Sequence, residues 1–363
     1  MSNELVTFGE IMSRFSPQMK LRLEQVMPGK IEVTFGGAEA SVAVSYSRLG
    51  GKSHFVTALP KNSMADACVM DLKYHGVGTD NIIRADHGRL GTYYLETGSN
   101  QRASKVEYDR TGSSVSILNP SDYDWDTIFQ NKTWLHITGI TPAISKNACE
   151  ATKEAVKKAK EQDITISCDL NFRGKLWAWD NNYSPKELAK KEMTQILKYA
   201  DIVIGNEQDA EDVLGVKIKH SDFDSGIIQV SQYPKIAEKI SDKFDNLSHI
   251  GITLRESISA DHNRWGAMLF DCEKKEAYFA PQKDEKYVPY EITNIVDRLG
   301  AGDSFAAALI YSLHELRMQE KDALNFSVAA SCIAHSIKGD FNITKVDEIK
   351  KLADGFTSGR VVR

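Results

Sequence analysis

The sequence predicts an α/β fold in which a mostly parallel central sheet is covered by helices on both faces and carries a small second β-sheet as a lid. Two observations predict this fold. From residue 130 onward, short β-branched or apolar runs alternate with longer helical patterns, as in proteins with parallel sheets. Residues 11–34 and 88–118 break that rhythm, because they read as short alternating strands separated by turn residues.

Strands are expected at Trp134–Ile140, Ile164–Asp169, Ile202–Ile204 and His249–Leu254. Between the first two, SKNACEATKEAVKKAKEQD starts with serine, has apolar or small residues at helical spacing and has a lysine-rich outer face, which is typical of an amphipathic helix. The polar stretch 215–235 predicts no clear element.

The chain is expected to divide into a body and a lid. The lid comprises residues 11–34 and 88–118, neither of which has a helix long enough for a crossover connection. The body comprises residues 1–10, 35–87 and 119–363.

Composition points to a small-molecule partner. The 363 residues carry 45 Lys+Arg and 50 Asp+Glu, a net charge of −5, without long runs of one sign. This balance argues against nucleic acid or an anionic membrane as the main partner. The N-terminus lacks the features of a signal peptide, and no apolar run is long enough to span a membrane. The five cysteines form no CxxC pair, so we expect no zinc cluster or disulfide framework and a soluble, cytoplasmic protein.

Two short motifs resemble known binding sites but lack residues that those sites require. GGKS at 50–53 looks like the end of a P-loop, but Tyr46 stands where the first glycine is required and the segment precedes a strand. We interpret it as a helix C-terminus followed by glycine. DYDWD at 122–126 resembles a calcium loop, but Thr127 and Thr133 replace its glycine and glutamate, so we interpret it as a solvated turn that enters a strand.

The stretch DRLGAGDSF at 297–305 is the strongest candidate for chemistry. Gly300, Ala301 and Gly302 form a turn after a strand-like run, and an apolar helical pattern follows. Such a helix start directs several backbone N–H groups to one point and attracts anions. Asp303 is then either a helix cap or a base, and the motif alone does not decide between them.

Other polar residues follow neighbouring strands. A Gly-Gly turn opens FGGAEASVAVSYSRLG at 35–50, CDLNFR at 168–173 ends one strand, and GNEQDAEDVLG at 205–215 ends another. Ligands of open parallel sheets bind beyond the carboxyl ends of the strands, so these groups are expected to converge on one crevice.

These motifs, in this order and spacing, resemble the ribokinase-like sugar kinases of the phosphofructokinase B type over nearly the whole chain. Within that family DRLGAGDSFAAALIY, FGGAEASVAV and GNEQDAEDVLG are most similar to 2-keto-3-deoxygluconate kinases. The resemblance implies a Rossmann-like, three-layer body with a β-lid, Mg-ATP bound over the C-terminal half, and phosphoryl transfer to a sugar hydroxyl. Asp303 is then the base, and the N–H groups of Gly300, Ala301 and Gly302 form an anion hole.

The acidic cluster after the strand at 202–204 has two readings. Asn206, Glu207 and Asp209 could simply cap the following helix. The resemblance implies that Asn206 contacts the nucleotide and that Glu207 and Asp209 organise Mg²⁺ and phosphates, largely through water. Asp209 stands where the family has a longer glutamate.

The expected substrate carries a carboxylate, which favours a cationic, planar partner. By resemblance, the substrate-binding residues are Gly36, Gly37, Ser41, Tyr93, Tyr108, Arg110 and Arg173. Ser41 replaces an asparagine of the family and would reach a hydroxyl through water. The alternative is that the lid arginine is solvated or forms a cross-strand ion pair.

The nucleotide contacts implied by the resemblance are Thr253 and Arg255 at the end of a strand, and Ser327 near the adenine. Close helix packing would also select a small residue at 327. Arg298, where the family has Thr or Pro, either approaches the phosphates or faces solvent.

Two other functions remain open at this point. A kinase of a neutral ketose such as fructose would keep every catalytic part, and a sugar-binding protein of the same fold would have no turnover. We also expect a homodimer in which two lids pair edge to edge and bury their apolar faces.

Overall fold

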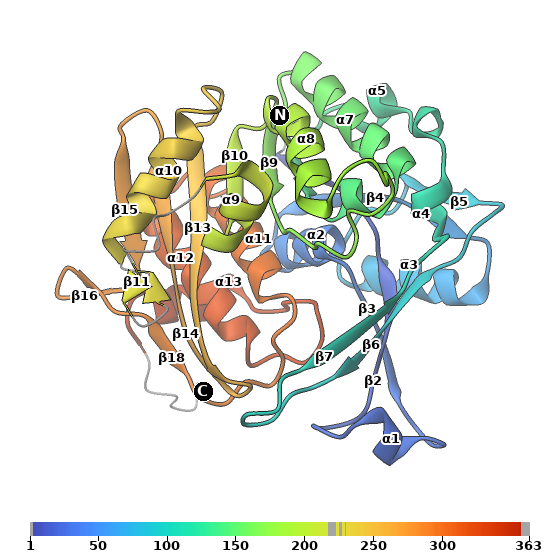
Figure 1. The fold of residues 1–363 in the computed structure, drawn as a ribbon, viewed down its shortest axis with the longest axis horizontal. Coiled ribbons are helices and arrows are strands. Elements are labelled where there is room, and N and C mark those ends of the chain that lie inside the picture. Colours follow the sequence, from blue (N-terminus) through green and yellow to red (C-terminus); the bar gives the residue numbers. More distant parts are fainter. Residues whose placement is uncertain (1–2, 217–222, 225–226, 229, 357–363) are drawn as a thin grey trace.

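The computed structural model describes residues 3–216, 223–224, 227–228 and 230–356 (Figure 1). A ten-stranded sheet has the strand order β15-β14-β13-β10-β9-β8-β1-β4-β5, with β18 paired to β14. The strands from β13 to β5 run parallel, whereas β14 pairs antiparallel with β13, β15 and β18. Their bounds are β1 Glu4–Phe8, β4 Lys52–Pro60, β5 Ile82–Ala85, β8 Trp134–Thr138, β9 Thr165–Asp169, β10 Ile202–Gly205, β13 His249–Ser259, β14 His262–Asp271, β15 Glu276–Ala280 and β18 Tyr290–Ile292.

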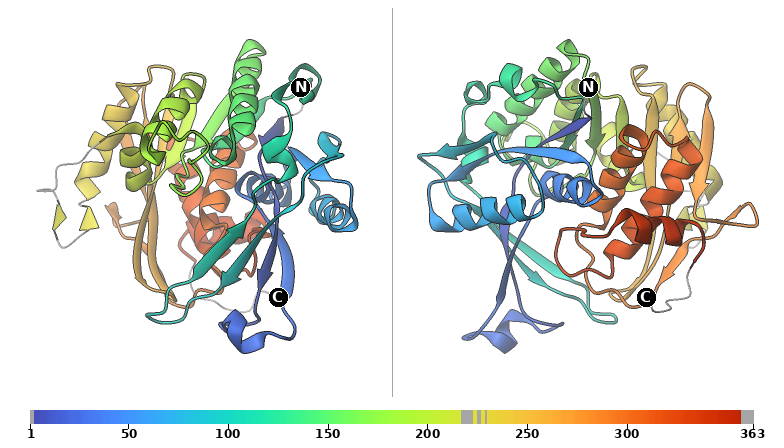
Figure 2. Two further views of the ribbon diagram at one scale, coloured as in Figure 1. Left: turned by 45° about the vertical axis from the view of Figure 1, so that its right-hand side comes forward. Right: turned by 180° about the vertical axis from the view of Figure 1, so that it is seen from behind.

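Helices cover both faces of this sheet, as the view turned by 45° and the view from behind show (Figure 2). One face carries α2 (Ala38–Arg48), α11 (Ala301–His314), α12 (Glu320–Ala334) and α13 (Val346–Ala353), whose apolar side chains form one core. The other face carries α7 (Lys146–Glu161), α8 (Pro185–Leu197), α9 (Glu207–Leu214) and α10 (Tyr233–Ser241) over a second core. The predicted three-layer α/β architecture is therefore confirmed.

The remaining helices are short, except α3 (Ser63–Tyr74), which packs beside α2. They are α1 (Leu23–Val26), α4 (Ser114–Ile117), α5 (Trp125–Ile128) and α6 (Thr141–Ile144), with 3₁₀ turns at Pro120–Asp122 and Val230–Gln232. Two-stranded ribbons pair β11 (Phe223–Asp224) with β12 (Ile227–Ile228), and β16 (Gln282–Lys283) with β17 (Lys286–Tyr287).

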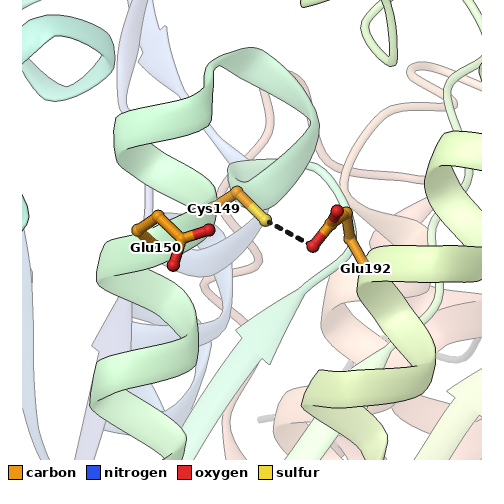
Figure 3. Close-up of side chains that lie close together, drawn as sticks. All are labelled: Cys149, Glu150 and Glu192. Atoms are coloured by element: carbon orange, nitrogen blue, oxygen red, sulfur yellow. Dashed lines mark hydrogen bonds between the residues drawn. The ribbon is translucent and has the colours of Figure 1, made fainter. Parts of the chain in front are cut away.

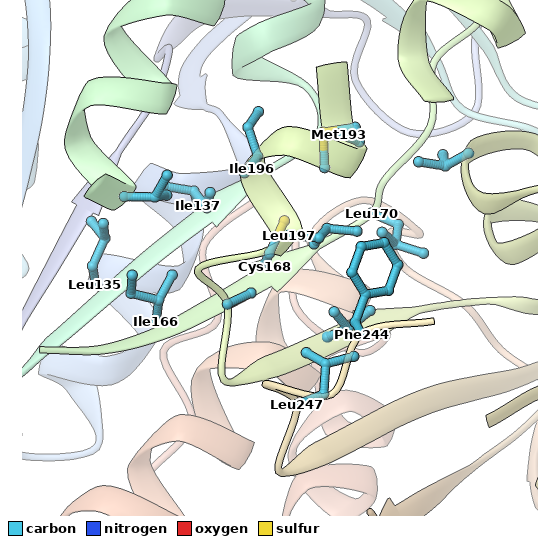
Figure 4. Packing of buried hydrophobic residues seen from close by; sticks show 14 of the residues in the cluster. Leu135, Ile137, Ile166, Cys168, Leu170, Met193, Ile196, Leu197, Phe244 and Leu247 are labelled. Carbon is cyan, nitrogen blue, oxygen red and sulfur yellow. The ribbon is translucent and has the colours of Figure 1, made fainter. Parts of the chain in front are cut away.

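The α8 helix shows why the sequence folds this way. Ser184 caps its first turn and forms a capping box with Glu187, in which each side chain accepts the backbone N–H of the other residue. Pro185 occupies the first helical position, where the missing N–H removes no helical hydrogen bond. Its apolar residues recur at helical spacing, so Met193, Ile196 and Leu197 fall on one buried face. Figure 4 shows these side chains packed over residues of β8 and β9.

The lid is a second, four-stranded sheet in the order β3-β2-β6-β7. The strands are β2 (Met12–Ser16), β3 (Glu32–Gly36), β6 (Gly91–Glu96) and β7 (Lys105–Asp109). Both regions predicted to form alternating strands contribute to it, β2 and β6 run parallel, and the other pairs are antiparallel. This small sheet is confirmed, whereas the division of the chain into body and lid at the stated residues stays a prediction.

Four predicted strands are confirmed as β8, β9, β10 and β13, although β13 extends to Ser259. The predicted helix C-terminus before GGKS is also confirmed, because α2 ends at Arg48 and Gly50 follows with a φ of 103°. Part of the unassigned stretch 215–235 lies outside the described residues. No described helix is both long and apolar enough to cross a bilayer.

The interpretation of DYDWD as a solvated turn was wrong. Asp124 caps α5, accepting the Thr127 N–H at 3.2 Å. Tyr123 and Trp125 are buried and both pack edge-on against Phe8 with ring centroids 5.1 Å apart. The alternation of carboxylates and aromatics therefore reflects a capped, half-buried helical turn.

Candidate active site

A cavity of about 500 Å³ lies at the carboxyl ends of the central strands, between the body and the lid. Its position follows from the parallel sheet, because the ends of β9 and β10 and the start of α11 all meet there. Its lining includes these residues predicted for the site: Gly37, Tyr93, Tyr108, Arg110, Arg173, Asn206, Glu207, Asp209, Thr253, Arg255, Gly300, Ala301, Gly302 and Asp303.

The glycine-rich turn opens directly onto this cavity. Gly300 has a φ of 78°, and a Cβ there would lie 2.2 Å from the carbonyl oxygen of Asp340. Only glycine satisfies both conditions. Ser304 N donates to Gly300 O at 2.8 Å, so the N–H groups of residues 301–303 precede the first intrahelical bond of α11. The turn therefore offers donors and the positive end of the helix dipole to an anion in the cavity.

Asp303 occupies the first turn of α11, and its half-buried side chain lines the same cavity. The N-cap is Gly300, so Asp303 does not cap this helix. Enclosure in the cavity raises the pKa of Asp303 well above its ordinary value, and the neighbouring carboxylates of Asp169 and Asp340 raise it further. A carboxylate that holds its proton more tightly than usual is suited to act as a proton acceptor.

A second carboxyl group with a raised pKa lies at the end of β9. Asp169 is 8% exposed and accepts the N–H of Asn171 at 3.1 Å. Burial, followed by repulsion from Asp209, raises the pKa of Asp169 to about 7. Nearby Arg173 is exposed, lines the cavity and donates to the Phe172 carbonyl at 2.9 Å.

The helix-capping reading of the acidic cluster is confirmed for two of its three residues. Asn206 is the N-cap of α9 and accepts the Asp209 N–H at 2.9 Å, and Asp209 accepts the Asn206 N–H at 3.2 Å. The other oxygen of Asp209 accepts the Phe172 N–H at 3.0 Å. Glu207 is half-buried in the cavity wall, and burial raises its pKa against the opposing charge of Arg255.

Arg110 is not a solvated lid arginine, because it is 9% exposed and forms an ion pair with the buried carboxylate of Glu10. The Arg110 Nε lies 2.6 Å from Glu10 Oε2, and the guanidinium lies 5.5 Å from the centre of the Tyr108 ring. Glu10 follows β1, so the pair joins the lid to the body. The predicted alternative of a paired arginine therefore applies to Arg110, although its partner lies in the body and both side chains line the cavity.

Three predicted residues do not line the cavity. Gly36 lies behind its wall, because a Cβ there would meet the Asp340 carboxylate at 2.5 Å. Ser41 is fully buried in α2, and among the described residues its Oγ has no hydrogen-bond partner. Ser327 is fully buried and donates to the Ala323 carbonyl at 2.6 Å within α12, as expected for a residue selected by helix packing.

The residues predicted to bind nucleotide lie on a longer strand than expected. Thr253 and Arg255 line the cavity from within β13, which continues as a hairpin into β14 instead of ending there. Arg298 lines the cavity too, but its guanidinium donates to the Ala260 carbonyl at 2.9 Å and to Asn263 at 2.7 Å. It therefore fixes the hairpin to the segment before the glycine-rich turn.

Sequence reasoning missed several buried acids. Glu39, in the first turn of α2, is 1% exposed, and one of its oxygens accepts the hydroxyls of Thr138 at 2.6 Å and Thr141 at 2.7 Å. Its other oxygen has no hydrogen-bond partner among the described residues. Glu10 and Asp340 also line the cavity. The only signal for Glu39 was a charge within the otherwise apolar helix pattern of GGAEASVAV.

Side chains of types that can bind a metal ion also meet outside the cavity. Cys149 and Glu150 of α7 lie near Glu192 of α8, with the Cys149 Sγ 3.8 Å from a Glu192 oxygen (Figure 3). The ammonium group of Lys153 lies 2.5 Å from Glu192 and 3.0 Å from Glu150. This lysine already pairs with both carboxylates, so the group is a partly buried ion-pair network.

The second such group is balanced in the same way. His249, Asp271 and Glu320 lie together at the end of the sheet opposite the cavity. The ammonium group of Lys274 lies 2.8 Å from Asp271 and 2.7 Å from Glu320.

A lidded α/β sheet with a glycine-rich helix start beside an acid in its cleft defines a ribokinase-like sugar kinase. The sequence matches the pfkB family carbohydrate kinases over residues 2–243 and 258–344. The chain belongs to this family and is a carbohydrate kinase.

Three known proteins illustrate the similarity. The crystal structure of 2-dehydro-3-deoxygluconokinase from Thermotoga maritima is 42% identical, covers 97% of this chain and all of that one, and superposes with a TM-score of 0.87. The 2-dehydro-3-deoxygalactonokinase of Haloferax volcanii is 29% identical over 99% of both chains. Fructokinase-2 of Solanum lycopersicum is 26% identical over 93% of this chain and 92% of its own.

Proposed function

We propose that this kinase transfers the γ-phosphoryl group of ATP to a hydroxyl of 2-keto-3-deoxygluconate. The observation that carries the proposal is that Asp303 and the Gly300–Gly302 turn share one cavity with the side chains of Arg110 and Arg173. The first pair supplies a proton acceptor and an anion site, and the second supplies cations for an acid sugar. The 42% identity to the Thermotoga maritima enzyme supports the same substrate.

In the proposed step, the sugar hydroxyl oxygen attacks the γ-phosphorus and forms a new P–O bond. The bond between the γ-phosphorus and the β,γ-bridging oxygen breaks, and ADP leaves with that electron pair. The hydroxyl proton passes to the carboxylate of Asp303. Backbone N–H groups of Gly300, Ala301 and Gly302 donate to the phosphoryl oxygens, where negative charge must be stabilised.

ATP is proposed to lie along the C-terminal half of the cavity, against Asn206, Thr253 and Arg255. Mg²⁺ supplies positive charge to the phosphates when bound. Glu207 fits that role, because its carboxylate is half-buried in the cavity wall. Asp209 fits less directly, since each of its oxygens already accepts a backbone N–H. We therefore propose that both act through water and that Glu207 has the larger part.

Because ATP is the donor, we place the activity in the cytoplasm.

Substrate recognition is proposed to depend on Arg110, Arg173 and the two lid tyrosines. Glu10 fixes Arg110 from the body side, so the arginine presents a preorganised edge to the cavity. Tyr108 is about half exposed on the lid, and Tyr93 donates its hydroxyl to Asp340 at 2.6 Å. Gly37 lines the cavity, and a Cβ there would lie 2.1 Å from the Glu10 carbonyl oxygen, whereas Gly36 and Ser41 act only behind the wall.

The test is ADP release with Mg-ATP and, in parallel, 2-keto-3-deoxygluconate, its galactonate epimer, gluconate, fructose and ribose. The galactonate epimer is included because of the name of the Haloferax volcanii relative, and fructose because of the tomato relative. Turnover on a keto acid but not on fructose supports the proposal. Turnover on fructose alone establishes a neutral ketose kinase, and no turnover with any sugar favours a sugar-binding protein.

Replacing Arg110 by glutamine is expected to raise KM for the keto acid about 10- to 100-fold, because a hydrogen bond to a charged group contributes about 1.5–3 kcal/mol. Glutamine keeps a donor for the buried Glu10, so the fold should persist. KM for ATP should stay unchanged. Steady-state kinetics over both substrates measures this.

The matched control is Arg89→Gln. Arg89 lies beside the same lid sheet, forms a two-pronged ion pair with Asp109 at 2.7 and 2.8 Å, and does not line the cavity. It should leave both KM values unchanged. An equal, small effect of the two substitutions would show that Arg110 does not bind the carboxylate.

The lid is proposed to form a homodimer. Exposed apolar side chains on the lid and its connecting loops include Met19, Leu21, Met27 and Val33. Pairing of two lids would remove this surface from water. Light scattering at micromolar protein concentration should give a mass of two chains. The substitution Val33→Lys, at the β3 edge of the lid sheet, should reduce that mass to one chain. A wild-type chain that stays monomeric would contradict the dimer.

A further inference from the structure

Arg14 is a lid residue buried against the body. It lies on β2 and is 2% exposed. Its Nη1 donates to Asp340 Oδ1 at 2.7 Å, and its Nη2 forms a short ion pair with Asp297 Oδ2. Both partners lie more than 280 residues away in the chain, on segments that flank the glycine-rich turn. One lid side chain therefore joins two body segments.

Asp297 holds the backbone around the turn. One of its oxygens accepts the N–H of Leu299 at 3.2 Å, and the other accepts the N–H of Gly339 at 3.1 Å. Leu299 immediately precedes Gly300. The position of the Asp297 carboxylate thus influences where the chain enters the anion site.

Asp340 touches the turn from the other side. Its carbonyl oxygen is so close to Gly300 that a Cβ there would lie 2.2 Å away. Its second carboxylate oxygen accepts the hydroxyl of Tyr93, a residue of lid strand β6. Asp340 also lines the cavity. Two lid strands are therefore tied to a residue that packs directly on the anion site.

We propose that Arg14 is a positioning residue that couples closure of the lid to the geometry of the Gly300–Gly302 anion site. This inference rests on the proposed function for the reaction it serves. Arg14 does not line the cavity. It acts through Asp297 and Asp340, with which it can pair only when β2 lies against the body.

A purely stabilising role explains these contacts less well. Buried ion pairs contribute little net stability compared with apolar packing, because both charges lose hydration. Here one guanidinium faces two carboxylates, and its Nε has no hydrogen-bond partner among the described residues. A guanidinium group provides hydrogen-bond donors in two fixed directions, which an apolar side chain does not.

Removing Arg14 is expected to lower kcat by roughly 10²-fold, since a displacement of about 1 Å in a positioned group has that effect. KM for the sugar should change less, because the sugar-binding arginines remain. Arg14→Ala leaves two buried carboxylates without a cation and can prevent folding. Arg14→Lys keeps the charge but not the two-pronged geometry, so it is measured in parallel and is expected to lose activity by a smaller factor.

Hydrogen exchange gives a readout that requires no turnover. The proposal predicts faster exchange at 297–302 and 336–341 in the Arg14 variants, with unchanged exchange in α7 and α8. Arg89→Gln serves as the lid control and should alter neither segment. A folded Arg14→Lys protein with kcat within twofold of wild type, or with unchanged exchange at both segments, would overturn the proposal. Absence of sugar-dependent ADP release in the wild type would refute the proposed function alone, because the exchange measurement still tests the coupling.

Discussion

Replacing Asp303 by asparagine is expected to lower kcat by roughly 10²–10⁴-fold, the usual contribution of a positioned general base. Asparagine has almost the same shape but accepts no proton at neutral pH. KM for ATP and sugar should change much less, because the N–H groups of the turn and the arginines remain. ADP release at saturating substrates measures the effect.

The matched control is Asp322→Asn. Asp322 holds the equivalent first-turn position in α12, is exposed and lies outside the cavity. It should keep the wild-type kcat. An equally active Asp303→Asn protein would show that another group takes the proton, with Asp169 the first to examine.

The same substitution has an expected pH signature. The folded-state pKa of Asp303 lies above its unfolded value, so the native state binds this proton more tightly than the unfolded state does. Stability therefore falls as pH rises from about 4, the ordinary carboxyl value, through the folded pKa. Asp303→Asn removes that loss, and its Tm should exceed the wild-type Tm at pH 8 but not at pH 4. Wild-type activity should fall as pH decreases through the same folded pKa.

The fold was predictable because its signals are local. Alternation of strand and helix patterns identified β8, β9, β10 and β13, and the serine-led lysine-rich segment identified α7. The lid strands were predictable from their short alternation and turns. The extension of β13 into a long hairpin was not, since its outer half is polar and pairs with β14 only through backbone bonds and tertiary contacts.

The candidate site was predictable only where its residues belong to a motif. Asp303, the glycine-rich turn and the strand-end residues share one cavity as expected. Ser327 does not reach it, because a small residue in a helix is equally suited to close packing. The charge pairs were invisible for another reason. Arg14 pairs with Asp297 and Asp340 only after the lid folds over the body, and the same is true of Arg110 and Glu10. The spacing of these residues in the sequence therefore does not predict the pairs.

Replacing Gly300 by alanine is expected to reduce both stability and activity. The added Cβ would lie 2.2 Å from the Asp340 carbonyl oxygen, and the φ of 78° is unfavourable for alanine. The turn must then move, which displaces the donors of the anion site. Loss of a single such donor lowers kcat by roughly 10²–10³-fold. Thermal unfolding and ADP release together measure both effects.

Gly302→Ala adds the same methyl group two residues later, with a different expected result. A Cβ at this position meets no atom within 4 Å, and Gly302 lies inside α11, where alanine is favoured over glycine by about 0.5–1 kcal/mol. Tm should therefore stay equal or rise. The methyl group would nevertheless occupy cavity space beside the N–H groups, so kcat/KM for ATP should fall. A fully active Gly302→Ala protein would place the phosphates elsewhere, whereas a stable and inactive one would separate the geometry of the anion site from its contribution to folding.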